Sequence, residues 1–169
     1  WIIKLILKFT IMKIFKLSTV LCLFMLFTSL GSFAQRVVSA DDLTPQFLKE
    51  TFDNAYIEVL EVKDTYVKVK DVFSVYMDID KSKRYIAFNS TYNLSDKATP
   101  AKALALMNKL NAEVALLKAY YNESSNTITY YYYFWTEGGF TQKSLIGALK
   151  LYKTALNLTL EKDTEMLIK

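Results

Sequence analysis

A run of uncharged residues at positions 127–135, Thr-Ile-Thr-Tyr-Tyr-Tyr-Tyr-Phe-Trp, predicts the central element of the fold. β-Branched and aromatic residues favour the pleated strand, and successive side chains of a strand point to opposite faces. The even-numbered row of this strand contains Ile128, Tyr130, Tyr132 and Phe134, and the odd-numbered row contains Thr127, Thr129, Tyr131, Tyr133 and Trp135. Because both rows are rich in rings, we expect an interior strand with other elements packed over both of its faces.

The pattern upstream of this run predicts a helix followed by a meander. Thr44 and Pro45 are typical of a helix start, with Thr as N-cap and Pro at the first helical position, and the helix should end near Asn54. Alternating apolar residues then predict four antiparallel strands. These strands begin near Ile57, Tyr66, Phe73 and Arg84, and Val67, Val69, Ile86 and Phe88 are expected to point inward.

The remaining pattern predicts two more helices and one more strand. Thr99 and Pro100 repeat the helix-start signal, a strand is expected over residues 115–121, and a long amphipathic helix should run from Thr141 to Glu165. The expected buried positions are Ala103, Leu104, Met107 and Leu110 in the first of these helices and Leu145, Leu149, Tyr152, Leu156 and Leu160 in the second. The order α-β-β-β-β-α-β-β-α with an antiparallel sheet indicates an α+β fold.

Residues 12–34 have the features of a secretory signal peptide. Lys13 and Lys16 precede an apolar segment, and small residues precede a cleavage site expected between Ala34 and Gln35. We therefore expect a leader over residues 1–34 with translation starting at Met12, a linker over 35–42, and one domain over 43–169. The protein should be exported to the periplasm or secreted.

An uncleaved leader is the alternative. Residues 2–11 would extend the apolar segment into an anchoring helix, and this would be the only contact of the protein with a membrane. The segment from Leu17 to Leu30 is itself shorter than the roughly twenty residues that a spanning helix needs.

The charge of the chain argues against nucleic acid as a partner. The formal net charge is +4, but the four lysines among the first sixteen residues account for this excess, and the rest of the chain is neutral. A basic surface for a nucleic acid is therefore not predicted.

The composition also excludes several kinds of chemistry. The chain has no His, and its single Cys, Cys22, lies in the leader. Thiol nucleophiles, Ser-His triads, and zinc sites built from His or Cys are thus excluded after Gln35. Asp78 and Asp80 lack the spacing of a calcium loop and are interpreted as part of a charged turn. We expect no catalytic residues, no metal and no cofactor.

Two candidate sites follow from the aromatic strand. If helices cover only one face of the sheet, Tyr131, Tyr133 and Trp135 form a partner-binding surface as large as the greatest apolar patch on a typical monomer. The alternative is that neighbouring side chains and the last helix already cover this row. A small-ligand pocket between the sheet and the last helix is the second candidate, lined by Tyr130, Tyr132, Phe134 and Tyr152.

A longer succession of motifs carries a family resemblance. Residues 105–111 read Ala-Leu-Met-Asn-Lys-Leu-Asn, and they are followed by a hairpin over 115–135, by Glu137-Gly138-Gly139-Phe140-Thr141 and by a long helix. This succession resembles the YbjN domain family of bacterial sensory-transduction regulators, whose fold is similar to that of type III secretion chaperones. The resemblance covers roughly residues 43–160. It implies a non-enzymatic bacterial protein and brings no catalytic residues, while the export signal differs from the cytoplasmic members of the family.

The motif residues themselves have simple structural interpretations. Asn108 and Asn111 are expected to cap the helix end or to bond to the following loop. Glu137, Gly138 and Gly139 are expected to form a strand-to-helix turn, or alternatively a set of backbone N–H groups that hold a ligand.

The sequence therefore predicts an exported, non-enzymatic interaction module that binds a protein partner, or itself as a homodimer, through the aromatic sheet face or the last helix. A small-ligand binding protein is the alternative.

Overall fold

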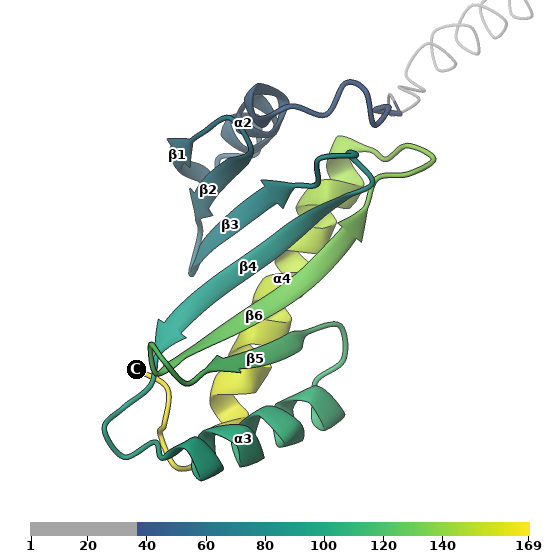
Figure 1. Ribbon diagram of the computed structural model, residues 1–169. Helices are drawn as coiled ribbons and strands as arrows, with labels where there is room; N and C mark the ends of the chain where they lie inside the picture. The colour runs from purple at the N-terminus through teal and green to yellow at the C-terminus, as the bar shows by residue number, and fades with distance from the viewer. Residues whose placement is uncertain (1–36) are drawn as a thin grey trace, which may run out of the picture. The chain divides into compact units, whose positions relative to one another are not determined.

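A six-stranded antiparallel sheet with the order β1-β2-β3-β4-β6-β5 is the frame of the protein (Figure 1). The computed structural model describes residues 37–169. The strands are β1 (Glu58–Val62), β2 (Tyr66–Lys70), β3 (Ser74–Ile79), β4 (Tyr85–Asn93), β5 (Lys118–Asn122) and β6 (Thr127–Trp135). The predicted meander and the aromatic strand are confirmed, and β6 lies inside the sheet between β4 and β5.

Three helices of the described residues complete the fold. They are α2 (Pro45–Asn54), α3 (Pro100–Glu113) and α4 (Gln142–Lys162), and the element order confirms the predicted α+β arrangement. Each helix begins at a threonine cap, because the hydroxyls of Thr44, Thr99 and Thr141 accept hydrogen bonds from the backbone of the first turn. None of these helices has both the length and the apolar content to cross a bilayer.

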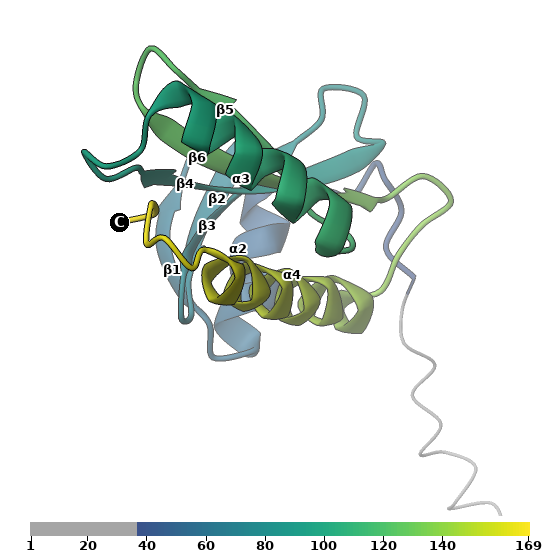
Figure 2. The ribbon, with the colours of Figure 1, turned by 90° about the horizontal axis from the view of Figure 1, so that it is seen from below.

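The helices lie at different places along the sheet. α4 runs along one face of the sheet, as Figures 1 and 2 show from two directions. α2 packs beside β1 and β2 at one end, and α3 packs beside β5 at the other. The hydrophobic core therefore lies between α4 and the face of the sheet that it covers.

Every second side chain of each strand points into this core. Tyr130 and Tyr152 are fully buried, and the Tyr152 hydroxyl donates a hydrogen bond of 3.1 Å to the carbonyl oxygen of Tyr130. The predicted inward pairs on the other strands are confirmed as well, and the core includes Val67, Val69, Val75, Met77, Ile86, Phe88, Ile128, Leu145, Leu149 and Leu156.

Two residues that were predicted to lie on the buried faces of α3 and α4 are exposed. Leu104 is 54% exposed, and Leu106 is buried in its place, because the buried stripe of α3 is centred one position further round the helix. Leu160 is 41% exposed, whereas Thr159 is buried. The Thr159 hydroxyl donates to the carbonyl oxygen of Leu156, so its burial leaves no unpaired donor.

The connection between α3 and β5 is longer than predicted. The strand begins at Lys118 rather than at residue 115. Leu116 has a φ of 73°, which is left-handed backbone that a strand cannot contain. Val114 and Leu117 are buried on either side of it and hold the turn against the core.

Both ends of the described chain pack against the domain. Val38, in the segment predicted as a linker, is buried and pairs with Phe140 through hydrogen bonds of 2.7 and 3.0 Å. Val38 thus belongs to the packed part of the described chain, and the predicted domain boundary at residue 43 stays a prediction. At the other end Ile168 pairs with Leu94. The predicted leader and the cleavage site between Ala34 and Gln35 lie outside the described residues.

Replacing Leu149 by Ala tests the packing of α4 on the sheet. Leu149 is 1% exposed, so we expect the free energy of unfolding to fall by about 2–5 kcal/mol in chemical denaturation. Leu158 lies on the same helix and is 41% exposed, and its replacement by Ala should cost less than about 1 kcal/mol. Equal losses in the two variants would contradict the observed face of α4.

The buried phenols predict a loss of stability in alkali. Burial raises the pKa of Tyr130 and of Tyr152 above the ordinary value. Their contribution to stability is therefore fully present below the unfolded-state pKa of about 10 and is lost as the pH rises through the folded-state pKa. The free energy of unfolding should fall above pH 10 by up to about 1.4 kcal/mol per pH unit for each phenol.

Tyr152→Phe is the control for this pH dependence, measured by chemical denaturation between pH 8 and pH 11. The variant lacks one of the two titrating groups, so its slope should be smaller than that of the wild type. An unchanged slope would show that other groups cause the alkaline loss.

Candidate interaction surface

The side chains that alternate with the buried ones point to the face of the sheet opposite α4, and α4 leaves this face uncovered (Figure 1). We call this surface the open face. It is formed by Tyr66 and Lys68 of β2, Tyr76 and Asp78 of β3, Tyr85, Ala87 and Asn89 of β4, Tyr131, Tyr133 and Trp135 of β6, and Lys118 and Tyr120 of β5.

The strand register arranges these side chains in rows across the sheet. One row runs Lys68, Tyr76, Asn89, Tyr131 and Lys118. A second row runs Tyr66, Asp78, Ala87 and Tyr133, and a third pairs Tyr85 with Trp135. Residues that lie far apart in the sequence thus form one continuous aromatic surface.

The three residues predicted to bind a partner lie on this surface. Trp135 is 62% exposed and Tyr133 is 44% exposed, while Tyr131 is partly buried. The expectation that both faces of β6 would be covered is therefore wrong, because α4 packs on the even-numbered row alone. Tyr120 of the neighbouring edge strand, 57% exposed, adds a ring that the sequence analysis did not select.

Contacts between rings hold the centre of the open face in place. The ring of Tyr85 meets that of Tyr133 at 5.3 Å and 87°, and that of Trp135 at 5.7 Å and 72°. Tyr131 and Tyr133 are nearly parallel at 6.3 Å. Edge-to-face and stacked pairs of this kind stabilise one another, so the exposed rings are ordered before any partner arrives.

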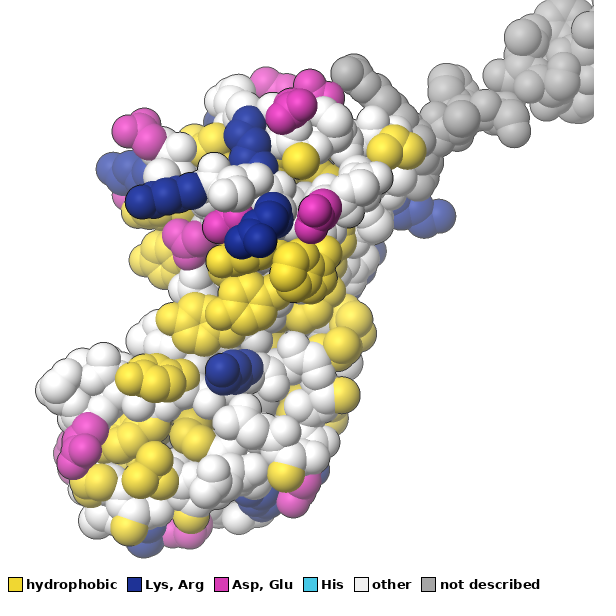
Figure 3. Space-filling view, turned by 45° about the vertical axis from the view of Figure 1, so that its right-hand side comes forward, with side chains coloured by type: hydrophobic (Ala, Val, Ile, Leu, Met, Phe, Trp, Pro, Cys, Tyr) yellow, Lys and Arg dark blue, Asp and Glu magenta, His cyan; other side chains and the backbone are white. Residues whose placement is uncertain are grey.

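Polar groups surround this aromatic centre. The Asn89 amide donates a hydrogen bond of 2.5 Å to the Asp78 carboxylate, and the Lys68 ammonium lies 4.8 Å from the centroid of the Tyr76 ring. Figure 3 shows hydrophobic side chains gathered in a band across the middle of the molecule, with charged side chains of both signs on either side. The open face thus has an apolar centre and a polar rim.

The phenol of Tyr131 remains uncharged at neutral pH. Burial raises the pKa of Tyr131, and the neighbouring Tyr133 and Asp78 raise it further. The hydroxyl is therefore available to donate and to accept hydrogen bonds with a partner.

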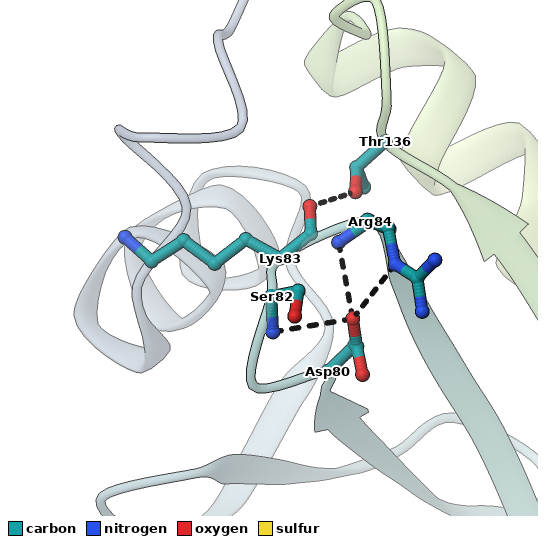
Figure 4. A network of polar contacts seen from close by, with 5 residues as sticks. All are labelled: Asp80, Ser82, Lys83, Arg84 and Thr136. Carbon is teal, nitrogen blue, oxygen red and sulfur yellow. Dashed lines mark hydrogen bonds and ion pairs between the residues drawn. The ribbon is translucent and has the colours of Figure 1, made fainter.

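A turn at one end of the open face fixes the strands that carry Tyr85 and Trp135 (Figure 4). The Asp80 carboxylate accepts hydrogen bonds from the backbone N–H groups of Ser82 and Arg84 at 3.2 and 3.4 Å, and lies 3.6 Å from the Arg84 side chain. Asp80 therefore closes the turn between β3 and β4, as the interpretation of a charged turn predicted, whereas Asp78 lies on the open face.

Thr136 links this turn to the end of β6. Its hydroxyl donates to the carbonyl oxygen of Lys83 at 2.6 Å, and its N–H donates to that of Arg84 at 2.8 Å. Within residues 37–169 no group of three or more acidic, His or Cys side chains is placed to hold a metal. The polar network at this end of the sheet holds the β3–β4 turn to the end of β6.

The residues predicted to line a ligand pocket lie in the core or pack against it. Tyr130 and Tyr152 are fully buried, and the Tyr152 ring lies 6.0 Å from Phe88 and 6.5 Å from Tyr132. Phe134 meets Phe140 edge-on at 5.6 Å. Two cavities, of about 180 and 300 Å³, lie elsewhere, beside the end of α4 and beside the start of α2. The small-ligand pocket stays a prediction.

The motif residues have separate roles in the structure. Asn108 and Asn111 are both exposed at the surface of α3, and Asn111 bonds to the backbone of β5. Gly138 and Gly139 have φ values of 86° and 90° and form the turn between β6 and α4. A Cβ on Gly139 would lie 3.2 Å from the carbonyl oxygen of Val38, and a φ of 90° is strained for any residue with a side chain, so this position favours glycine.

Comparison with known proteins places this geometry in a family. Residues 72–160 match the family model YbjN, described as "Putative bacterial sensory transduction regulator", and the match spans more than half of the chain. The chain belongs to the YbjN family. The matched segment contains β3, β4, β5 and β6, so most of the open face lies within the YbjN domain.

Two solved structures are similar to this chain. The crystal structure of YbjN from E. coli is similar with a TM-score of 0.62 and 15% identity, covering 73% of this chain and 94% of that chain. A chain of the HopA1–SchA chaperone–effector complex is similar with a TM-score of 0.47 and 11% identity, covering 67% of this chain and 93% of that chain. No curated protein matches. The predicted YbjN resemblance is thus confirmed.

Replacing Asp80 by Ala tests whether the turn supports the open face. The substitution removes the acceptor of the bonds from Ser82 and Arg84, so the free energy of unfolding should fall by about 1–3 kcal/mol. The emission of Trp135 should change as well, because the strand ends that hold its ring are loosened. Asp64→Ala, in the exposed turn between β1 and β2, is the control and should change neither quantity. An unaltered Asp80→Ala variant would contradict this role.

Proposed function

We propose that this YbjN-family protein is a non-enzymatic interaction module that binds a partner protein through the open face. One observation carries the proposal: Tyr133 and Trp135 are substantially exposed although their rings are packed and ordered. Large rings left in water on a rigid surface are typical of sites that another protein covers.

The energetics of covering these rings support association. At 62%, 57% and 44% exposure for Trp135, Tyr120 and Tyr133, the three side chains present roughly 300–400 Å² to water. Covering that area contributes about 8–10 kcal/mol before the cost of association. A stable interface buries about 800 Å² on each partner, so the neighbouring rows of the open face must take part.

The composition of the open face favours a protein as the occupant. Tyr and Trp give a large contact area with little loss of side-chain entropy, and their polar ends, together with Asn89, can bond to a partner's surface. The charges of Lys68 and Lys118 are accompanied by that of Asp78 and do not form a continuous basic groove of the kind that single-stranded nucleic acid requires. A second copy of the chain is the simplest partner.

The proposal includes the compartment in which the protein acts. The leader over residues 1–34 would direct the protein to the periplasm or out of the cell, where the partner would be met. If the leader remained uncleaved, the same surface would act at the membrane.

The test compares two double variants of the protein. Tyr131→Ser with Tyr133→Ser alters the open face and keeps Trp135 as a reporter, whereas Leu151→Ser with Leu158→Ser alters two exposed side chains on α4. Light scattering over a range of concentrations measures self-association, and quantitative capture from a periplasmic extract measures binding of other proteins. We expect only the open-face variant to lose association.

Fluorescence gives a second measurement on the same samples. Binding at the open face should shift the emission of Trp135 to shorter wavelength and protect it from acrylamide. Equal loss of association in both variants, or association that leaves Trp135 fully quenchable, would refute the proposal.

A further inference from the structure

The sheet has two edges, and each must be kept from pairing with a strand of another chain. β5 forms one edge and β1 forms the other. β1 has a register shift between Val59 and Glu61 and carries Glu58 and Glu61, and both a bulge and edge charges disfavour further strand pairing. β5 is a regular strand without a register shift in its pairing with β6.

A single side chain bonds to both outward backbone groups of Ala119, on the β5 edge. The Asn111 amide, at the last turn of α3, donates a hydrogen bond of 3.0 Å to the carbonyl oxygen of Ala119 and accepts one of 2.7 Å from its N–H. An added antiparallel strand would exchange the same two bonds with Ala119. The side-chain amide of Asn111 therefore stands in for one residue of a neighbouring strand.

The orientation of Ala119 shows that these groups lie on the outer side of the edge. In an antiparallel pair the N–H and C=O of one residue point to the same side. Ala119 lies opposite Tyr130 of β6, and because its two groups bond to Asn111 on α3, they are directed away from β6. α3 lies beside the strand at this edge (Figure 1).

We propose that Asn111 closes the β5 edge against strand addition and so determines which surface of the protein is open to association. With β1 bulged and charged and Ala119 of β5 paired with Asn111, strand addition is disfavoured at both edges, and a partner can still reach the open face. The role of Asn111 does not depend on the proposed function, because the edge is closed whether or not the open face binds anything.

Asn108 provides the matched control. It lies on the same helix one turn earlier, it is exposed, and its side chain makes no hydrogen bond with the residues that the structure describes. The two substitutions Asn111→Ala and Asn108→Ala thus make the same chemical change, and only one of them frees the edge.

Hydrogen exchange and light scattering together test the proposal. In dilute Asn111→Ala protein, exchange of the Ala119 amide should accelerate about tenfold, in line with the loss of one or two hydrogen bonds. At high concentration this variant should associate, and the Ala119 amide should become protected again as a strand adds to β5. Asn108→Ala should match the wild type in both measurements.

The experiment is repeated with Tyr131→Ser and Tyr133→Ser in the same chain. Association of Asn111→Ala should persist there, which separates this proposal from the one for the open face. The proposal is overturned if Asn111→Ala associates no more than the wild type, or if it associates while the Ala119 amide still exchanges quickly. If Asn111→Ala does not fold, Asn111→Ser, whose hydroxyl can satisfy one of the two groups, is judged by the same two criteria.

Discussion

The structure depends on the packing of α4 against one row of side chains on β6. Successive residues of a strand face opposite ways, so burying Ile128 and Tyr130 under α4 directs Tyr131, Tyr133 and Trp135 to the other side. The alternation of side chains along β6 therefore produces both the core and the open face. A change of register by one residue would exchange them, and this couples the stability of the fold to the presentation of its exposed rings.

Rings act differently on the two sides of the sheet. On the covered side Tyr152 and Tyr130 are joined by a buried hydrogen bond and surrounded by core residues. On the open side Tyr85 fixes Tyr133 and Trp135 by edge-to-face contacts, while Asp80 and Thr136 hold the strand ends beneath them. Order on the exposed side thus comes from neighbouring rings and a turn rather than from burial.

Local signals in the sequence were sufficient to predict the helices and strands, but they did not predict which faces of the sheet are covered. The caps at Thr44 and Thr99 and the alternation over residues 127–135 act within a few positions, so the helices and strands could be predicted. Whether helices pack on one or both faces of the sheet depends on the whole chain. The prediction that both faces of β6 are covered was therefore wrong. Leu104 and Leu160 were predicted to be buried and are exposed. The periodicity of a helix does not indicate from which direction its neighbours pack against it. The pairing of Asn111 with Ala119 requires α3 to turn back onto an edge, which no local pattern indicates.

The pairing of Val38 with Phe140 ties the start of the described chain to the turn before α4. If the leader is removed after residue 34, only residues 35–37 separate the scissile bond from the folded sheet, a reach of about 10 Å for an extended chain. A peptidase that grips several residues on both sides of its target would collide with the finished domain. Processing would then have to come first, with the segment joining the start of α4 only once its new amino end is free.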